Sequence, residues 1–313
     1  MLPEYLPANE LEMLVQRALS EDLVSAAAGL GDRAEDVTTA ATVPEEATAS
    51  ARIQAKEAGV AAGLAVAGRV FRAAGEPVSV TWAVEDGTRV EAGDTVGQVD
   101  GGARPLLVAE RAALNFMQRM SGIATATRRM AERARPHGAE ILDTRKTAPG
   151  LRALDKWAVR LGGGTNHRLG LHDLILIKDN HLAAAGGVRP ALEEAHRYCE
   201  KHDADDLQIE LEARTLDEVR VALDAAGEAA SDGCGPDIVL LDNMARRTES
   251  GEVDATMLRK AVERIDGRFR TEASGNVTPR TVEAIAKTGV DAISSGALTH
   301  SVRALDLSMR LRS

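Results

Sequence analysis

The second half of the chain alternates short apolar runs with stretches of helical periodicity. Apolar runs of strand length recur at 139–142, 173–178, 207–212, 237–242, 268–273 and 290–294. Between them lie segments with the spacing of amphipathic helices, at 150–160, 188–202, 215–227, 254–265 and 278–288. This repetition predicts a parallel sheet, and its regular spacing favours an α/β barrel over an open doubly wound sheet. No G-x-G-x-x-G motif follows any of the runs, which counts against a dinucleotide-binding fold.

The first half follows a different pattern. Apolar positions at helical spacing predict helices over Asn9–Leu23 and Pro105–Arg135, with Ser121-Gly122 as a point where the longer helix kinks or breaks. Between 48 and 99, short alternating segments and Asp-Gly or Gly-Asp turns predict strands and hairpins. These strands resemble the small β-sandwich of biotinyl and lipoyl carrier domains. The turn expected at 100–104 lacks the lysine that a carrier needs, which favours a structural domain.

Composition is that of a globular protein with a sizeable core. The 313 residues are 44% hydrophobic and 27% charged, which allows one large domain or two ordinary ones. Only 2% are aromatic and the formal net charge is −10, which argues against nucleic-acid binding. Two cysteines, Cys199 and Cys234, make no disulfide framework. Without a recognisable signal peptide or an apolar run of the ~20 residues that span a bilayer, we expect a cytoplasmic protein with no membrane partner.

Basic residues gather at the ends of two predicted strands within Ile141–Leu182. The groups that can converge there are Arg145, Lys146, His167, Arg168 and Lys178. Burying so much positive charge without a counter-charge is costly. An acidic chain that concentrates positive groups in one segment therefore indicates a pocket for a small, multiply anionic ligand.

The later predicted strands end in carboxylates and glycines. Glu210 and Glu212 alternate along one strand and face the same side, and Asp242 ends the next strand. Together they can hold Mg²⁺, bind sugar hydroxyls, stabilise a developing cation, or pair with Lys146 and Lys178 as a structural network. The last two strands are followed by loops typical of phosphate sites in barrels, Ser274-Gly275-Asn276 and Ser295-Gly296.

No nucleophile or zinc site is evident in the sequence. The spacing of His167, His172 and His181 is not that of metal-binding histidines, and no serine occupies a G-x-S-x-G elbow. Basic groups, strand-end carboxylates and glycine loops together favour group transfer by positioning and electrostatics.

These motifs, in this order along almost the whole chain, resemble those of the quinolinate phosphoribosyltransferases, also called carboxylating nicotinate-nucleotide pyrophosphorylases. The matching pieces are Glu21-Asp22, Asp36-Val37-Thr38-Thr39, Glu110-Arg111, Ser121-Gly122, Asp143-Thr144-Arg145-Lys146-Thr147, Gly162-Gly163-Gly164, Asn166-His167-Arg168, Lys178-Asp179-Asn180-His181, Leu241-Asp242-Asn243 and Glu272-Ala273-Ser274-Gly275. One departure is a loop at 25–36 that is longer than the family pattern.

The resemblance implies an α/β fold in which an N-terminal α/β sandwich, residues 1–118, precedes an incomplete TIM-like α/β barrel, residues 119–300. The C-terminal residues 301–313 would return to the first domain as a helix. The implied reaction transfers a phosphoribosyl group from 5-phosphoribosyl 1-pyrophosphate to quinolinate with Mg²⁺. Its products are nicotinate mononucleotide, pyrophosphate and CO₂, in NAD biosynthesis. The resemblance also implies a homodimer, or a hexamer of dimers, with Arg111 reaching the neighbouring subunit's site.

The resemblance assigns roles to the candidate residues as well. Quinolinate would be clamped by Arg145, His167, Arg168 and Lys178, with Arg111 from the partner. Lys146, followed by Thr147, would lie near the pyrophosphate and the reacting centre. Glu212 and Asp242 would hold ribose and Mg²⁺, directly or through water, so the implied catalytic residues are Lys146, Glu212 and Asp242. The 5-phosphate would be bound by Ser274, Gly275, Asn276, Ser295 and Gly296.

Three other functions stay open at this point. A related transferase acting on nicotinate would need fewer basic groups than this cluster provides. A non-catalytic binding protein of the same fold is disfavoured by the presence of Lys146, Glu212 and Asp242 together. A Schiff-base aldolase would use Lys146 or Lys178, whose cationic neighbours favour a reactive amine.

Overall fold

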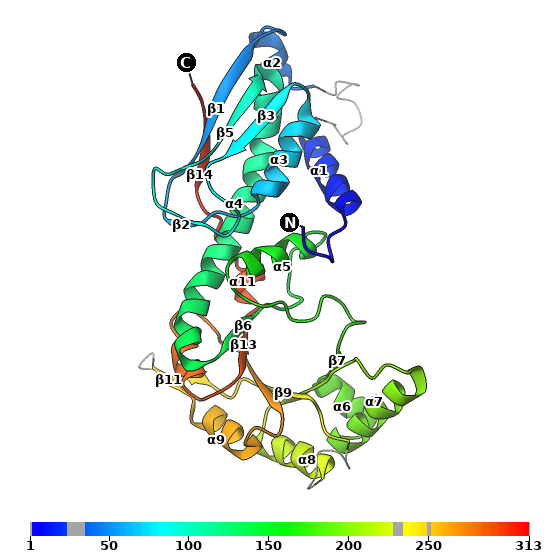
Figure 1. Ribbon diagram of the computed structural model, residues 1–313. Helices are drawn as coiled ribbons and strands as arrows, with labels where there is room; N and C mark the ends of the chain where they lie inside the picture. Colours follow the sequence, from blue (N-terminus) through cyan, green and yellow to red (C-terminus); the bar gives the residue numbers. More distant parts are fainter. Residues whose placement is uncertain (1, 24–34, 228–233, 249–251, 313) are drawn as a thin grey trace. The chain divides into compact units, whose positions relative to one another are not determined.

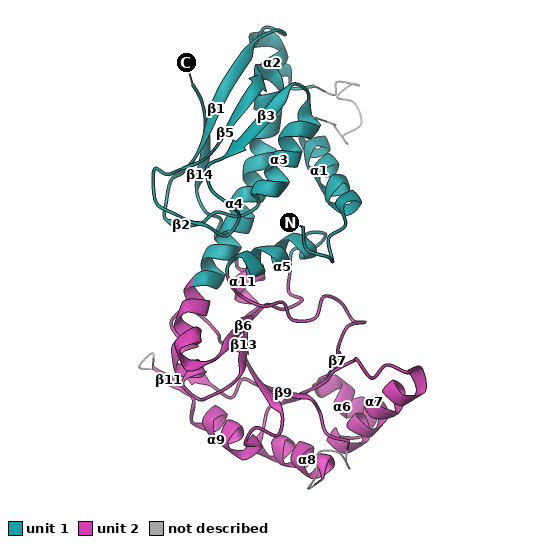
Figure 2. Cartoon of the chain, viewed as in Figure 1, with its two compact units in different colours: residues 1–128, 148–162, 302–313 teal, residues 129–147, 163–301 magenta. Residues whose placement is uncertain are grey.

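A computed structural model describes residues 2–23, 35–227, 234–248 and 252–312 (Figure 1). Two compact units make up the chain (Figure 2). Unit 1 consists of residues 1–128, 148–162 and 302–313, and unit 2 consists of residues 129–147 and 163–301. The division after residue 128 falls within one helix. The expected long loop at 25–36 lies almost entirely outside the described residues.

Unit 1 is built on a four-stranded antiparallel sheet with the order β14-β1-β5-β3. The strands span Thr48–Ala55 (β1), Val78–Trp82 (β3), Thr95–Gly102 (β5) and Leu307–Arg312 (β14). Ala51, Ile53 and Ala55 alternate along β1 and are fully buried, so one face of this sheet lies against the core. A separate ladder pairs β2, Gly59–Val60, with β4, Arg89–Val90.

The helices of unit 1 confirm three predictions and add others. The predicted helices are α1, Ala8–Leu23, α4, Ala103–Ala134, and α5, Arg152–Leu161, which the pattern predicts at 150–160. Helix α3, Leu64–Ala74, is not predicted by the pattern at 48–99, because a short apolar run does not distinguish a helix from a buried strand. Another helix that the pattern does not predict is α2, Val37–Thr42, which the Asp36 carboxylate caps by accepting the N–H of Thr39 at 3.0 Å.

Three expectations for unit 1 are wrong. The C-terminal segment is the strand β14, because alternating Leu307 and Met309 pair antiparallel with β1. No hairpin turn occurs at 100–104, since β5 runs directly into α4. Helix α4 also continues through Ser121-Gly122. A Cβ on Gly122 would lie 2.2 Å from the carbonyl oxygen of Arg303, so this glycine serves close packing rather than a break.

Unit 2 contains a six-stranded parallel sheet with the order β6-β13-β12-β9-β8-β7. Its strands coincide with the six predicted runs: β6, Glu140–Leu142; β7, Ile175–Ile177; β8, Ile209–Ala213; β9, Ile238–Asp242; β12, Arg270–Ser274; β13, Ala292–Ser294. The strands follow chain order around the sheet, and the first pairs with the last. Within the described residues β6 and β7 do not pair with each other. The sheet is therefore a barrel left open between these two strands, which confirms the predicted incomplete α/β barrel.

The predicted barrel helices are also present: α7, Val188–His202; α8, Leu216–Ala226; α9, Thr256–Ile265; α10, Val282–Ala286. Helices α7, α8 and α9 pack in series along the outside of the sheet (Figure 1). The short elements that the pattern does not predict are α6, Asp179–Ala185; α11, Ala297–His300; the 3-10 turn η1, Arg135–His137; and the antiparallel pair of β10, Arg246–Arg247, with β11, Val253–Asp254. Segments this short carry too few positions to show a period.

Alternation along these parallel strands places polar side chains on one face of the sheet. Glu210 of β8 lies opposite Ile238 of β9, and Leu240 of β9 lies opposite both Glu212 and Glu272. Paired residues in a sheet point to the same side, so all five side chains share one face. The other face carries the buried apolar residues that pack under the helices: Ile209, Leu211, Val239, Leu241 and Ala273. The carboxylates therefore project into the barrel.

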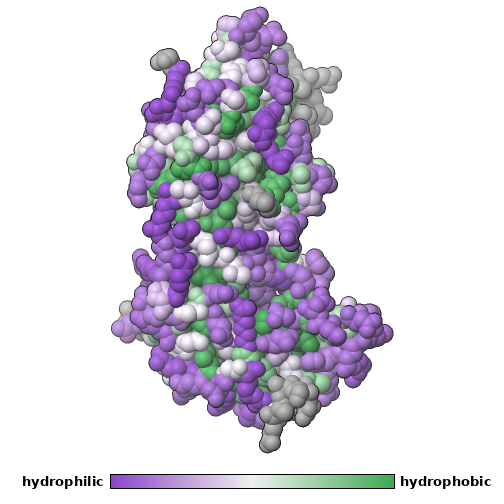
Figure 3. Space-filling model, in the orientation of Figure 1, coloured by the Kyte–Doolittle hydropathy of each residue, from purple (hydrophilic) through white to green (hydrophobic). Residues whose placement is uncertain are grey.

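The visible surface is mostly hydrophilic, with hydrophobic areas scattered between charged residues (Figure 3). Among the described residues, no helix is both long and apolar enough to cross a membrane.

Candidate active site

Two arginines lie near each other at the open edge of the barrel. Arg145 follows β6 and Arg168 precedes β7. Burial, and next the charge of Arg145, lower the pKa of Arg168 from its usual value. Nε of Arg145 is buried and has no hydrogen-bond partner within the described residues. Two neighbouring guanidinium groups, one of them with an unsatisfied donor, have the chemistry to bind an anion.

A buried aspartate holds the two segments that carry these arginines. Asp143 is fully buried and accepts hydrogen bonds from the side chain of Asn166 at 2.6 Å and from the N–H of His167 at 2.9 Å. The N–H of Thr165 donates to the carbonyl of Ile141 at 2.8 Å. The segment before β7 therefore runs along the exposed edge of β6, which brings together residues predicted from separate motifs.

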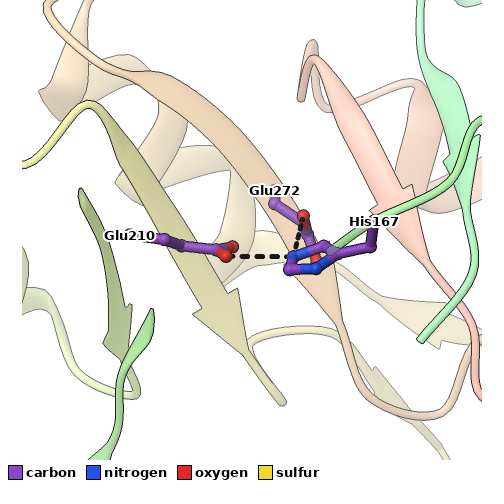
Figure 4. A group of neighbouring side chains, drawn as sticks. All are labelled: His167, Glu210 and Glu272. Carbon is purple, nitrogen blue, oxygen red and sulfur yellow. Dashed lines mark hydrogen bonds and ion pairs between the residues drawn. The ribbon is translucent and has the colours of Figure 1, made fainter. Parts of the chain in front are cut away.

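His167 lies between two glutamates inside the barrel (Figure 4). Its Nε2 is 2.9 Å from Glu210 Oε2 and 3.5 Å from Glu272 Oε2. Its Nδ1 accepts the backbone N–H of Arg168 at 2.8 Å. An acceptor at Nδ1 requires the ring proton to be on Nε2, which therefore donates to the glutamates. A metal at this cluster would need the Nε2 lone pair, so the hydrogen bonds argue against a metal site here.

The two glutamates share a strongly perturbed environment. Glu210 and Glu272 are 0% and 2% exposed. Burial, followed by the neighbouring charge of Glu210, raises the pKa of Glu272 to about 7, against the opposing effects of His167, Ser294 and Arg270. Glu272 therefore carries a proton through much of the range below neutrality.

Cations and carboxylates alternate at the ends of β7, β8 and β9. Nζ of Lys178 lies 2.9 Å from Glu212 Oε2, and Arg214 contacts the other oxygen of Glu212 at 3.1 Å. Arg214 also contacts Asp179 at 2.8 Å and Asp242 at 3.4 Å. Arg214 is not among the residues that the sequence predicts for the site. The alternation that singles out Glu210 and Glu212 extends to it, because residues 210, 212 and 214 share one side of β8.

The glycine loops after β12 and β13 are held by specific close contacts. Gly275 has a φ of +94°, and a Cβ there would lie 2.2 Å from Oδ1 of Asn243. A Cβ on Gly296 would lie 2.9 Å from Cδ of Lys146, so the lysine stem passes directly over this glycine. Thr299 donates to the carbonyl of Lys146 at 2.8 Å. Both loops need glycine because another side chain occupies the space of its Cβ.

Two features limit how these loops can bind a phosphate. The N–H of Ser295 donates to the carbonyl of Leu142 at 3.0 Å, so it is already used within the sheet. The helix after Asn276 begins only at Val282, and α11 is a single turn of four residues. Any phosphate would therefore rely on loop N–H groups rather than on the terminus of a long helix.

The structure brings most predicted residues together in unit 2. Lys178 pairs with Glu212, Arg214 joins Glu212 to Asp242, and Lys146 lies on the loop of Gly296. Thr147 is half-buried beside Lys146 in the chain, and Ser274 ends β12. Arg111 belongs to unit 1, where it is exposed on α4. Among the described residues, no hydrogen bond or ion pair joins Arg111 to the other predicted site residues.

Comparisons with known proteins agree over nearly the whole chain. Residues 36–121 match the model of the quinolinate phosphoribosyl transferase N-terminal domain, and residues 123–310 match that of its C-terminal domain. A mitochondrial, decarboxylating quinolinate phosphoribosyltransferase of Nicotiana glauca is 49% identical over 305 residues, covering 97% of this chain and 83% of that protein. A carboxylating nicotinate-nucleotide pyrophosphorylase of Mycobacterium leprae is 42% identical, covering 95% of each chain. The solved nicotinate-nucleotide pyrophosphorylase of Francisella tularensis aligns with a TM-score of 0.83 at 35% identity, covering 98% of this chain and 97% of that one.

Proposed function

The chain belongs to the quinolinate phosphoribosyl transferase family, and we propose that it transfers a phosphoribosyl group from 5-phosphoribosyl 1-pyrophosphate to quinolinate with loss of CO₂. The products are nicotinate mononucleotide and pyrophosphate, in NAD biosynthesis. The observation that carries this proposal is the pair Arg145 and Arg168, because two adjacent guanidinium groups match a planar dicarboxylate. The names of the relatives agree with both the acceptor and the decarboxylation.

For the acceptor, Arg145, Arg168 and Lys178 supply the positive charge. Guanidinium groups bind carboxylates through two parallel hydrogen bonds, and Nε of Arg145, which has no partner among the described residues, is available for one of them. We propose that Arg111 of a second copy completes this clamp, in a homodimer or a hexamer of dimers. The exposure of Arg111 on α4 supports this role, since the side chain is open to a neighbouring subunit.

For the donor, we propose that Lys146 binds the pyrophosphate, with Thr147 beside it, and that Glu212 and Asp242 bind the ribose. Loop N–H groups of Ser274, Gly275, Asn276 and Gly296 would take the 5-phosphate, while Ser295 holds its loop to β6. The contact of Lys146 with Gly296 supports this arrangement, because it puts the lysine beside a loop suited to phosphate.

We propose Mg²⁺ as the cofactor, held by Asp242 and Glu212, directly or through water. Carboxylate oxygens and substrate phosphates are its usual ligands. Lys178 and Arg214 engage both oxygens of Glu212, whereas Arg214 and Asn243 both contact Oδ2 of Asp242. These carboxylates therefore fit Mg²⁺. Asp242 fits better than Glu212, and Arg214 would have to move away from the carboxylate that binds the ion. When bound, the ion would neutralise charge on the pyrophosphate.

The chemistry demands no nucleophile from the chain. The ring nitrogen of quinolinate forms a bond to the ribose as pyrophosphate leaves, and the carboxylate of Glu212 stabilises positive charge developing on the sugar. The bond to the neighbouring carboxylate then breaks, and its electron pair stays on the ring carbon beside the positively charged nitrogen. A proton takes the place of CO₂. The family assignment thereby replaces the aldolase and binding-protein alternatives.

The acceptor is tested by parallel assays of the purified protein with 5-phosphoribosyl 1-pyrophosphate, Mg²⁺ and either quinolinate or nicotinate. We expect nicotinate mononucleotide in the assay with quinolinate and none in the assay with nicotinate. The opposite result would show that the acceptor is nicotinate. Cytoplasmic localisation stays a prediction, since the Nicotiana glauca relative is named as mitochondrial.

A further inference from the structure

Two buried glutamates behind the arginine pair have no part in the proposed reaction. Glu210 of β8 and Glu272 of β12 project from the same face of the sheet, on either side of β9, and meet at Nε2 of His167 (Figure 4). Each also has a buried Oε1 without a hydrogen-bond partner in the described part of the chain. Placing two carboxylates together in a protein interior costs free energy, which raises the question of what these two glutamates do.

The hydrogen bonds of His167 indicate what these glutamates do. The ring has two tautomers, and only the one with its proton on Nε2 leaves Nδ1 free to accept the N–H of Arg168. The other tautomer would direct two donors at each other. Acceptors at Nε2 select the required tautomer, and carboxylate oxygens of Glu210 and Glu272 lie 2.9 and 3.5 Å from Nε2.

The tautomer of His167 determines where Arg168 is held. Asp143 fixes the backbone N–H of His167, and the His167 ring fixes the backbone N–H of Arg168. The guanidinium of Arg168 donates to the carbonyl of Leu174 at 3.2 Å and lies beside the like charge of Arg145. Like charges repel, so anchoring of the backbone helps to keep the guanidinium of Arg168 near that of Arg145. The buried charge of Glu210 also attracts Arg168.

We propose that Glu210 and Glu272 are positioning residues of the quinolinate site, which hold His167 in its Nε2–H tautomer and so keep Arg168 in place beside Arg145. This rests on the proposed function of the site. It changes the role of His167, because both ring nitrogens are engaged by the protein. The ring supports the clamp from behind, and the two arginines with Lys178 contact the dicarboxylate.

The test replaces both glutamates by methionine or both by glutamine. Methionine keeps the volume and removes the acceptors, and replacing buried ionic groups by apolar ones often leaves a fold equally stable. Glutamine keeps an acceptor oxygen for Nε2–H. The matched control is Glu140→Gln, which removes a carboxylate from the exposed pair with Arg270 in the same sheet. Binding of quinolinate alone is measured by calorimetry, and the KM for each substrate by steady-state assay.

The methionine double variant is expected to bind quinolinate at least tenfold more weakly, with the KM for 5-phosphoribosyl 1-pyrophosphate within twofold of wild type. The glutamine double variant and Glu140→Gln should stay within threefold for both substrates. Nitrogen-15 spectra of labelled histidine should show the Nε2–H tautomer in wild type and its loss in the methionine variant. If the double variant does not fold, Glu210→Met carries the test, because Glu210 is the nearer acceptor.

Equal quinolinate affinity in wild type and the methionine variant would overturn the positioning role. So would an equal loss for both substrates, since that indicates a general disturbance of the fold. Wild-type protein that fails to bind quinolinate under any condition would instead remove the proposed function, which separates the two failures.

Discussion

The ammonium group of Lys178 lies 2.9 Å from Oε2 of Glu212, on the ends of neighbouring barrel strands. In the proposed reaction these two residues serve different substrates, since Lys178 binds a quinolinate carboxylate and Glu212 binds the ribose. Each therefore neutralises the other while the site is empty and exchanges this partner for a substrate on binding. The ion pair compensates the charge of the buried Glu212 carboxylate in the empty site, and both side chains stay available to bind substrates.

Lys178→Ala should weaken quinolinate binding by about 10- to 100-fold, because a charge-assisted hydrogen bond is worth about 1.5–3 kcal/mol. The effect should appear in the KM for quinolinate. The matched control is Lys287→Ala, which removes a lysine from an exposed pair with Glu283. Equal KM values for Lys178→Ala and the control would contradict the assigned role.

Arg145→Ala should separate binding from stability. The substitution removes a repulsive neighbour of Arg168 and an unsatisfied donor, so the melting temperature should be equal to or above that of wild type. Quinolinate affinity should fall at least tenfold. Thermal unfolding with and without quinolinate measures both effects, with the exposed Arg189→Ala as control. A marked loss of stability would show that Arg145 is structural.

Arg214→Gln should strengthen the binding of a divalent cation in the absence of substrates. The guanidinium of Arg214 contacts three carboxylates and competes with any ion there. Titration with Mn²⁺ followed by electron paramagnetic resonance measures the affinity directly, and about a tenfold gain is expected. Arg220→Gln, which removes an arginine paired with Asp217 and Asp224, controls for net charge. An unchanged affinity would place the metal elsewhere.

Glu272 gives stability a specific dependence on pH. Its pKa is raised from 4.5 to about 7, so the folded state holds a proton that the unfolded state releases between these values. This contribution is fully present below pH 4.5 and is lost as the pH rises through 7. Its upper limit is about 3.5 kcal/mol, at about 1.4 kcal/mol per pKa unit.

Denaturant unfolding of wild type and Glu272→Gln at pH 5 and pH 8 isolates this contribution. The free energy of unfolding should fall less for the variant than for wild type over this interval. Parallel curves for the two proteins would show that Glu272 does not change its protonation there.

Arg111 is tested by mixing inactive subunits. If Arg111 acts on the neighbouring subunit's site, a dimer of one Arg111→Ala and one Lys178→Ala subunit has one intact site. Random exchange should then restore about a quarter of wild-type activity, since half of the dimers are mixed and each has one of two sites intact. Failure to restore activity would place Arg111 and Lys178 in the same subunit's site.

The sequence predicts the barrel well because each strand is a separate apolar run between helices of clear period. The site follows from the same pattern, since parallel strands end at one edge and alternate residues share a face. Glu212, Asp242 and Lys178 are found in this way. The elements that the sequence does not predict correctly depend on contacts between residues far apart in the chain. Nothing local in α3 or β14 indicates the sheet against which they pack.

The sequence likewise does not predict which side chains contact each other. Arg214 follows the alternation of β8, but only its three carboxylate contacts give it a place in the site. His167 is correctly grouped with the arginines, yet its two hydrogen-bonded nitrogens are known only once Glu210 and Glu272 are placed around it. Ser295 has the right neighbours for a phosphate loop, and its N–H is used by Leu142.

The central claim is tested most directly by the release of labelled CO₂ from quinolinate carrying the label in the carboxyl group next to the ring nitrogen. We predict release that requires both 5-phosphoribosyl 1-pyrophosphate and Mg²⁺ and matches the nicotinate mononucleotide formed one to one. Label retained in a product, or CO₂ released without the phosphoribosyl donor, would contradict the account of transfer followed by decarboxylation.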